Sequence, residues 1–212
     1  MKFFGRTMEV DELRGIRKLS RKSARMTVVT GRRRVGKTEL VRQALDDGGD
    51  TPFLYFLITR APQSAVCESL QGEIARVFGR PMPGRIERFA DIFRFIMEKS
   101  TTTPLTLVVD EFQKFDRSAP EVYSEVAGVW DELHGKARIN LVFCGSEPTG
   151  SDLIATVGFP CHSGATLSIR RLPSFVKAYF CCGEFGDAPH KVDKPRALVP
   201  VKEVRAVGDA TD

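Results

Sequence analysis

The segment that most constrains the fold is residues 26–38, MTVVTGRRRVGKT, where a short apolar run passes into glycine and then into Gly36, Lys37 and Thr38. This segment fits the pattern G-x-x-x-x-G-K-[ST] and lies where a phosphate-binding loop is expected, between a predicted strand and a predicted helix. Glycines let backbone N–H groups approach phosphate oxygens, and the following helix presents the positive end of its dipole. The pattern predicts binding of a nucleoside triphosphate. The alternative is a chance match in a turn rich in glycine and arginine.

The loop residues have separate expected roles. Lys37 is expected to reach the outer phosphates, and the hydroxyl of Thr38 is expected to bind a magnesium ion that bridges two of them. The expected nucleotide-binding residues of the loop are Gly31, Arg32, Arg33, Arg34, Val35, Gly36, Lys37, Thr38 and Glu39.

Length and composition are typical of one globular α/β domain. The chain has 212 residues, of which 42% are hydrophobic, and no apolar stretch approaches the roughly 20 residues of a membrane-spanning helix. The N-terminus lacks the apolar core of a secretory signal. The five cysteines are odd in number and form no C-x-x-C pair, which argues against a disulfide framework. We therefore expect a cytoplasmic protein without membrane partners.

The net charge of +5 is unevenly distributed. Residues 1–34 contain eleven Lys and Arg against three Asp and Glu, whereas the charges of residues 147–212 balance. Clustered basic charge can indicate a nucleic-acid-binding surface. The simpler interpretation is a solvated basic helix over residues 14–25, because no groove-reading or aromatic-interleaved motif accompanies it.

Strands and helices are predicted to alternate along the chain. Buried apolar runs predict strands over residues 26–30, 53–58, 105–109 and 139–143. Helices are predicted over residues 8–23, 38–45, 63–78, 87–99 and 120–133, with a turn at 46–49. Strands separated by helical segments indicate an α/β fold of three layers, with a mainly parallel central sheet and helices on both faces.

A second chemical feature is LTLVVDEFQ, residues 105–113, where a predicted strand ends in Asp110 and Glu111. Ligands bind at the carboxyl ends of strands in open parallel sheets. Successive strand residues point to opposite faces, so only irregular backbone at the strand end lets both carboxylates approach one site. Asp110 is expected to hold magnesium, and Glu111 to orient and deprotonate the attacking water. Without the phosphate loop upstream, Asp-Glu would be an ordinary strand end.

A third feature is Ser146, at the end of the predicted strand INLVFCGS. A small polar side chain there could contact the γ-phosphate or the attacking water, which makes Ser146 the third candidate catalytic residue beside Lys37 and Glu111. The alternative is a serine in a strand-to-loop turn.

Together these motifs resemble the archaeal-type ATPase domain, a branch of the AAA-related P-loop ATPases. The resemblance covers residues 3 to about 147 and rests on Phe4-Gly5-Arg6 with Glu9 and Leu13, VVTGRRRVGKTEL, LYF, VVDEFQKF and the strand ending in CGS. It implies a P-loop NTPase fold in which the Cys144-Gly145-Ser146 strand separates the other two motif strands. It also implies ATP with Mg²⁺ as cofactors, Gly5 and Arg6 near the base, and Ser146 at the family's sensor position.

Residues after Ser146 depart from the family pattern. Gly164 is followed by Ala165 where the family has arginine, and Arg170 and Arg171 are candidate replacements for that charge. Residues 181–212 show no period and predict an irregular or disordered tail. The expected division is therefore a P-loop ATPase domain over residues 1–180 and a tail over 181–212. A truncated or frame-shifted gene would produce a tail of this kind.

Three functions remain open from the sequence. The first is ATP hydrolysis with magnesium at the phosphate loop and the Asp-Glu strand end. The second is a nucleotide-binding switch or truncated ATPase fragment that does not hydrolyse ATP. The third is a basic nucleic-acid-binding module in which the loop is incidental. Each of these three functions is compatible with a protein or nucleic-acid partner and with an oligomeric state.

Overall fold

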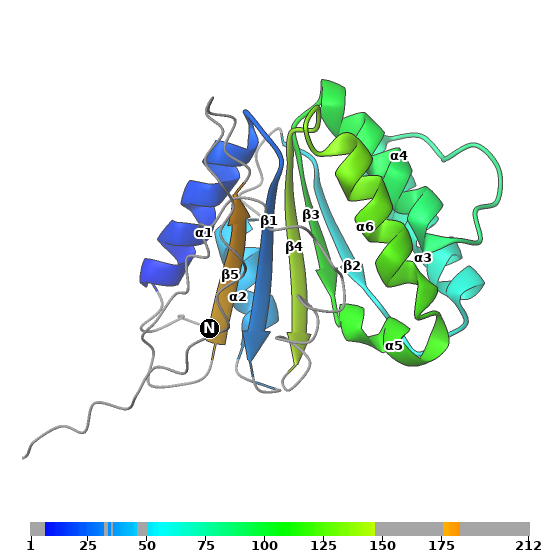
Figure 1. Ribbon diagram of the computed structural model, residues 1–212, viewed down its shortest axis with the longest axis horizontal. Coiled ribbons are helices and arrows are strands. Elements are labelled where there is room, and N and C mark those ends of the chain that lie inside the picture. Colours follow the sequence, from blue (N-terminus) through cyan, green and yellow to red (C-terminus); the bar gives the residue numbers. More distant parts are fainter. Residues whose placement is uncertain (1–6, 32–33, 35, 46–50, 147–175, 183–212) are drawn as a thin grey trace, which may run out of the picture.

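Five strands form one sheet in the computed structural model, which describes residues 7–31, 34, 36–45, 51–146 and 176–182 (Figure 1). In spatial order the strands are β2 (Phe53–Leu57), β3 (Leu105–Asp110), β4 (Ile139–Ser146), β1 (Arg25–Gly31) and β5 (Val176–Cys182). Strands β1 to β4 pair in parallel, whereas β5 pairs with β1 in antiparallel register.

The position of β4 decides the geometry of the site. It lies between β1 and β3, as the family resemblance implied, and its register sets Gly31 opposite Ser146 and Asp110 opposite Cys144. Parallel strands end at the same edge of a sheet, so the ends of β1, β3 and β4 meet there. The three motifs of the sequence are thus brought to one edge by strand pairing.

Helices cover both faces of the sheet (Figure 1). One face is covered by α1 (Thr7–Ser20) and α2 (Lys37–Leu45). The other is covered by α3 (Gln63–Phe78), α4 (Phe89–Thr102) and α6 (Glu121–Leu133). Side chains of β3 alternate between these layers: Val108 packs with α1 and α2, and its neighbours Leu107 and Val109 pack with the opposite cluster. None of the helices that the structure describes is long and apolar enough to cross a membrane.

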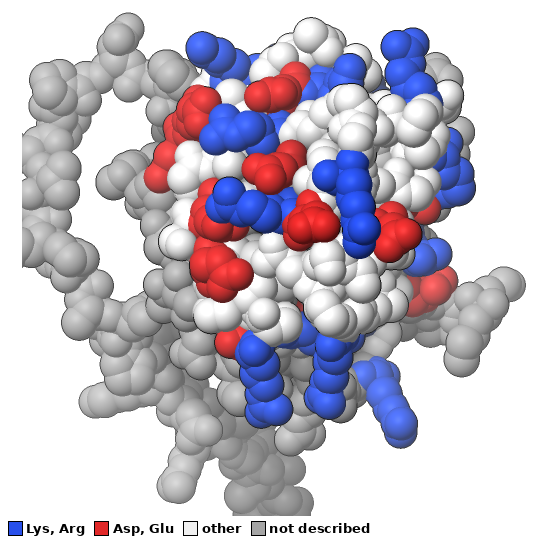
Figure 2. Space-filling view, turned by 90° about the vertical axis from the view of Figure 1, so that its right-hand side faces the viewer, with Lys and Arg blue, Asp and Glu red and all other residues white. Residues whose placement is uncertain are grey.

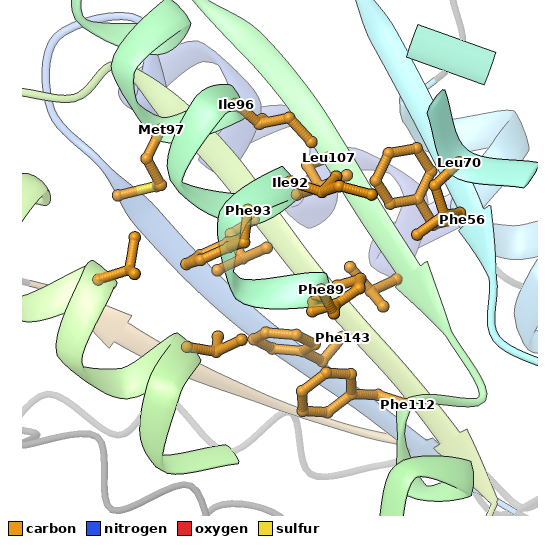
Figure 3. Packing of buried hydrophobic residues seen from close by; sticks show 14 of the residues in the cluster. Phe56, Leu70, Phe89, Ile92, Phe93, Ile96, Met97, Leu107, Phe112 and Phe143 are labelled. Carbon is orange, nitrogen blue, oxygen red and sulfur yellow. The ribbon is translucent and has the colours of Figure 1, made fainter. Parts of the chain in front are cut away.

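A group of aromatic rings fills the core next to the carboxyl end of β3. Phe112 opens the short helix η1 (Phe112–Lys114), and its ring centroid lies 4.6 Å from that of Phe143 and 5.0 Å from that of Tyr123. Figure 3 shows Phe112 and Phe143 side by side. Because β4, η1 and α6 share these contacts, the segment just after Asp110 is attached to the core rather than left as a surface loop.

The face formed by α4 and α6 carries interleaved charges. Figure 2 views the right-hand side of Figure 1, where α3, α4 and α6 lie, and shows acidic and basic side chains interspersed over its upper part. The exposed ion pair Arg94–Glu132 joins the two helices, and Arg88, just before α4, pairs with the partly exposed Glu125 of α6. This pattern is typical of a solvated surface.

Most predicted elements are confirmed, with shifted ends. The first helix ends at Ser20 instead of residue 23, because the chain turns where Lys22 N–H donates to the carbonyl of Leu19 at 3.0 Å. Helix α4 runs to Thr102, and Thr103 is extended because it precedes Pro104.

Two features near the ends of elements were not predicted. Helices η1 and α5 (Phe115–Ser118) occupy residues left without an element in the sequence. Strand β5 ends at Cys182 and so includes the first two residues of the expected tail, and it runs antiparallel. The predicted turn at 46–49 and the remainder of the tail, 183–212, lie outside the described residues.

Candidate functional site

The loop between β1 and α2 has the backbone of a tight turn at its described positions. Gly36 has a φ of 82°, a left-handed conformation that glycine adopts without steric cost, and Arg34 has a φ of 65°. The N–H of Leu40 donates to the carbonyl of Gly36 at 3.0 Å, so helical hydrogen bonding begins at this glycine. Lys37 opens α2 and is only 7% exposed, which is rare for a lysine.

Other predicted loop residues are less fully described. Thr38 and Glu39 lie in the first turn of α2 with exposed side chains. Arg32, Arg33 and Val35 lie outside the described residues, as do Gly5 and Arg6. Of Gly31 the structure describes the backbone, which ends β1.

Asp110 is the buried centre of the site. Its carboxylate oxygen Oδ2 accepts a hydrogen bond from the hydroxyl of Thr38 at 3.0 Å and a second from the hydroxyl of Tyr55. Its other oxygen, Oδ1, accepts the backbone N–H of Glu111 at 2.9 Å. The loop helix and the Asp-Glu strand, 72 positions apart in sequence, are therefore joined directly by Thr38 and Asp110.

The donor set here fits a magnesium ion. Mg²⁺ prefers oxygen ligands and usually takes one or two from protein side chains, with waters and phosphate oxygens completing the shell. A buried carboxylate next to the hydroxyl of Thr38, a residue exposed to solvent, supplies that set. The described residues contain no group of three or more His, Cys, Asp and Glu side chains arranged for a metal.

Tyr55 is a site residue that the sequence reasoning missed. It lies in β2, two residues before the residue that pairs with Asp110, and its half-buried hydroxyl donates to that carboxylate. Burial, followed by the hydrogen bond to Asp110, raises the pKa of Tyr55 well above its ordinary value, so the phenol keeps its proton and acts as a donor. The sequence signal was the place of Tyr55 in the LYF segment of the family resemblance, to which no role was assigned.

Glu111 leaves the strand in an unusual conformation. Its φ of 59° and ψ of 33° are left-handed, which confirms that irregular backbone follows the strand end at this position. Its carboxylate accepts from Nε2 of Gln113 at 3.2 Å and lies 3.7 Å from Nζ of Lys114. Lys114 in turn donates to the carbonyl of Ile58 at 2.8 Å. The Asp110 carboxylate thus contacts Thr38 and Tyr55, and the Glu111 carboxylate contacts Gln113 and Lys114.

A pocket of about 450 Å³ opens beside Glu111. It is lined by Glu111, Gln113, Lys114, Asp116, Arg117 and Ser118, with Arg60 from the segment after β2. This pocket gives solvent access to the Glu111 side chain.

The end of β4 contacts the same segment. A Cβ atom on Gly145 would lie 2.9 Å from Oε1 of Gln113, so glycine is what lets this side chain approach the strand.

Cys144 is buried opposite Asp110, and burial, followed by the negative charge of Asp110, raises the pKa of its thiol well above the ordinary value. Ser146 ends the strand opposite Gly31, and its side chain lies outside the described atoms.

A family model described as an AAA domain matches residues 20–149, more than half of the chain. The chain belongs to this AAA domain family. The matched region contains β1, the loop, Asp110, Glu111 and Ser146. The family places the chain among AAA-related P-loop ATPases, so the resemblance drawn from the sequence is confirmed.

Solved structures have the same fold as this AAA domain. Cdc6p from Pyrobaculum aerophilum aligns with a TM-score of 0.51 and 22% identity over 74% of this chain and 44% of its own. A Walker-type ATPase of Pyrococcus abyssi aligns with a TM-score of 0.50 and 18% identity over 74% of this chain and 49% of its own. The chain thus spans less than half the length of either. No curated protein matches it. The predicted three-layer P-loop NTPase fold is confirmed.

Proposed function

We propose that this AAA domain binds ATP with magnesium and hydrolyses the β–γ phosphate bond. The observation that carries the proposal is the 3.0 Å hydrogen bond between Thr38 and Asp110. It brings the hydroxyl of the phosphate loop and the buried carboxylate to one point, with Lys37 beside Thr38 at the start of α2. Family membership supports nucleotide binding by these residues.

Binding would rest on the loop and on the start of α2. The first N–H groups of a helix have no partner within it and can donate to phosphate oxygens. The ammonium group of Lys37 would neutralise the outer phosphates, and Thr38 and Asp110 would hold the magnesium ion. When bound, magnesium supplies positive charge that offsets charge building up on the phosphate oxygens in the transition state.

Turnover would rest on Glu111. Its carboxylate would accept a proton from the attacking water, and the pocket beside it admits that water. Gln113 and Lys114 fix the position of the carboxylate before substrate arrives. Catalysis of this kind depends on positioning and charge rather than on a covalent intermediate. Ser146, opposite Gly31, remains the proposed contact to the γ-phosphate or the water.

A second candidate function is an ATP-binding switch without turnover. The contacts of Gln113 and Lys114 favour it, because both approach Oε2 of Glu111 and compete with the attacking water for that oxygen. Magnesium-dependent phosphate release, measured beside nucleotide affinity, distinguishes the two functions. Binding without release would establish the switch.

Two substitutions test the assigned roles. Lys37→Ala should weaken ATP binding by about 10- to 100-fold, because hydrogen bonds to charged groups contribute about 1.5–3 kcal/mol. Glu111→Gln should bind ATP as the parent does and lower kcat by about 100- to 10,000-fold. Binding is measured with a fluorescent ATP analogue and turnover by phosphate release.

Exposed residues of the same types provide the controls. Lys136→Ala and Glu98→Gln should leave both quantities unchanged. If Glu111→Gln hydrolysed ATP as fast as the parent, the assignment of the base would be wrong. Salt-sensitive DNA binding that survives Lys37→Ala would instead favour the nucleic-acid-binding module.

A further inference from the structure

One hydrogen-bond partner of the Asp110 carboxylate comes from outside the two sequence motifs. Thr38 and the N–H of Glu111 belong to the two sequence motifs, whereas the third donor, the hydroxyl of Tyr55, comes from β2. We infer that Tyr55 is a positioning residue for the magnesium site, and that it sets the magnesium affinity by fixing the orientation of the Asp110 carboxylate. The inference rests on the proposed function.

Sheet register explains how Tyr55 reaches Asp110. In the parallel β2–β3 pair, Tyr55 lies opposite Val108 and Leu57 lies opposite Asp110. Residues two apart on a strand share a face, so Tyr55, Val108 and Asp110 all point toward the α2 side of the sheet. Tyr55 is therefore the diagonal neighbour of Asp110, and diagonal neighbours are within reach of an aromatic side chain.

The guanidinium of Arg42 packs over the ring of Tyr55. Its guanidinium carbon lies 4.4 Å from the ring centroid, within the range of a cation–π contact. Arg42 is one helical turn after Thr38 in α2, so both residues lie on the same face of that helix. Helix α2 thus contacts the Tyr55–Asp110 pair at two points, through the hydroxyl of Thr38 and through the guanidinium of Arg42.

The bond from Tyr55 is compatible with cation binding by Asp110. A carboxylate offers about four lone-pair positions, and among the described residues Thr38, Tyr55 and the N–H of Glu111 use three of them. If the hydroxyl of Thr38 turns toward a cation, Tyr55 and the N–H of Glu111 still hold both carboxylate oxygens. Partners that orient a metal ligand in this way typically change metal affinity by about 10- to 100-fold when they are removed.

The chain contains a matched control for this bond. Tyr123 also donates its hydroxyl to a carboxylate, that of Asp116, and burial raises its pKa just as it raises that of Tyr55. Tyr123 lies on α6, on the opposite face of the sheet from α2. Tyr55→Phe and Tyr123→Phe therefore remove the same type of bond, but only the first removes it from Asp110.

The test measures equilibrium binding of a fluorescent ATP analogue as magnesium is titrated, without relying on turnover. Tyr55→Phe should raise the magnesium concentration at half-maximal binding by about 10- to 100-fold, while affinity for the analogue in EDTA stays as in the parent. Tyr123→Phe should leave the magnesium midpoint unchanged. Arg42→Ala should shift it in the same direction as Tyr55→Phe by a smaller factor, which provides a second variant. Thermal unfolding of each variant verifies that it is folded.

The outcomes separate the inference from the proposed function. If the parent needs magnesium and Tyr55→Phe has the parent's midpoint, the positioning role is wrong and the proposed function stands. An equal shift in Tyr123→Phe would also overturn the role, because the effect would then be general to the fold. If the parent binds the analogue without any dependence on magnesium, both fail.

Discussion

The backbone of Glu111 is strained where the proposed base leaves the strand. A left-handed conformation costs a residue with a side chain roughly 1–2 kcal/mol, and glycine avoids that cost. The observed φ of 59° therefore means that the fold tolerates strain at Glu111, in a position where a carboxylate is useful.

This strain can be measured by comparing two variants that both lack the carboxylate. The free energy of unfolding of Glu111→Gly should exceed that of Glu111→Ala by about 1 kcal/mol in urea denaturation. At the exposed helical position Ser124 the order should reverse, with Ser124→Ala more stable than Ser124→Gly by about 1 kcal/mol. Equal stability of the two Glu111 variants would contradict a strained backbone.

Gly145 couples the end of β4 to the proposed base. In Gly145→Ala the new methyl group would lie 2.9 Å from Oε1 of Gln113, and this flexible side chain can move at small cost to the fold. Its hydrogen bond to Glu111 would then be lost or lengthened. We expect kcat to fall by about 10- to 100-fold, because a misplacement of about 1 Å can cost about 100-fold, while ATP affinity is retained.

The control for Gly145 is Gly72. A Cβ there meets nothing within 4 Å, so Gly72→Ala on α3 should leave kcat unchanged and raise the free energy of unfolding by about 1 kcal/mol. Unchanged turnover in Gly145→Ala would show that Gln113 does not position Glu111.

At the scale of elements, buried aromatic rings hold the site segment in place. Phe112 is fully buried and contacts Phe143 of β4, Tyr123 of α6 and Phe89 of α4. Phe112→Ala should lower the free energy of unfolding by about 3–5 kcal/mol, as other large-to-small core substitutions do. Arg94→Ala, which removes an exposed ion pair between α4 and α6, should leave the urea midpoint nearly unchanged. A large loss in the arginine variant would mean that surface charge, rather than the aromatic core, holds these helices.

At the scale of the whole molecule, a buried thiol links stability to pH. Burial, followed by the charges of Asp91 and Glu87, raises the pKa of Cys67 from 9.0 to about 11. Between these values the unfolded chain loses the proton and the folded chain keeps it, so the free energy of unfolding falls as pH rises from about 9 to 11. In Cys67→Ala the free energy of unfolding should fall less over this pH range, by about 2 kcal/mol, as measured by urea denaturation at each pH. An identical pH slope in both proteins would show that the thiol does not contribute.

Local pattern determined a large part of the fold of this protein. The apolar runs predicted β1 to β4 because buried parallel strands read as continuous hydrophobic segments. The phosphate loop was predicted from Gly36, Lys37 and Thr38, and the pair Asp110 and Glu111 from its place at a strand end, since both depend on residues adjacent in sequence. The position of β4 between the motif strands came from the family resemblance.

The tertiary structure decided how these pieces meet. The contact between Tyr55 and Asp110 depends on the register of β2 against β3, and hydrophobic pattern does not encode register between strands 55 positions apart. The left-handed backbone of Glu111 and the close approach of Gln113 to Gly145 depend on how η1 packs against β4. The sequence by itself thus determined which residues lie at the strand ends. Only the packed structure determined their hydrogen-bond partners, because those contacts join residues that local pattern treats as independent.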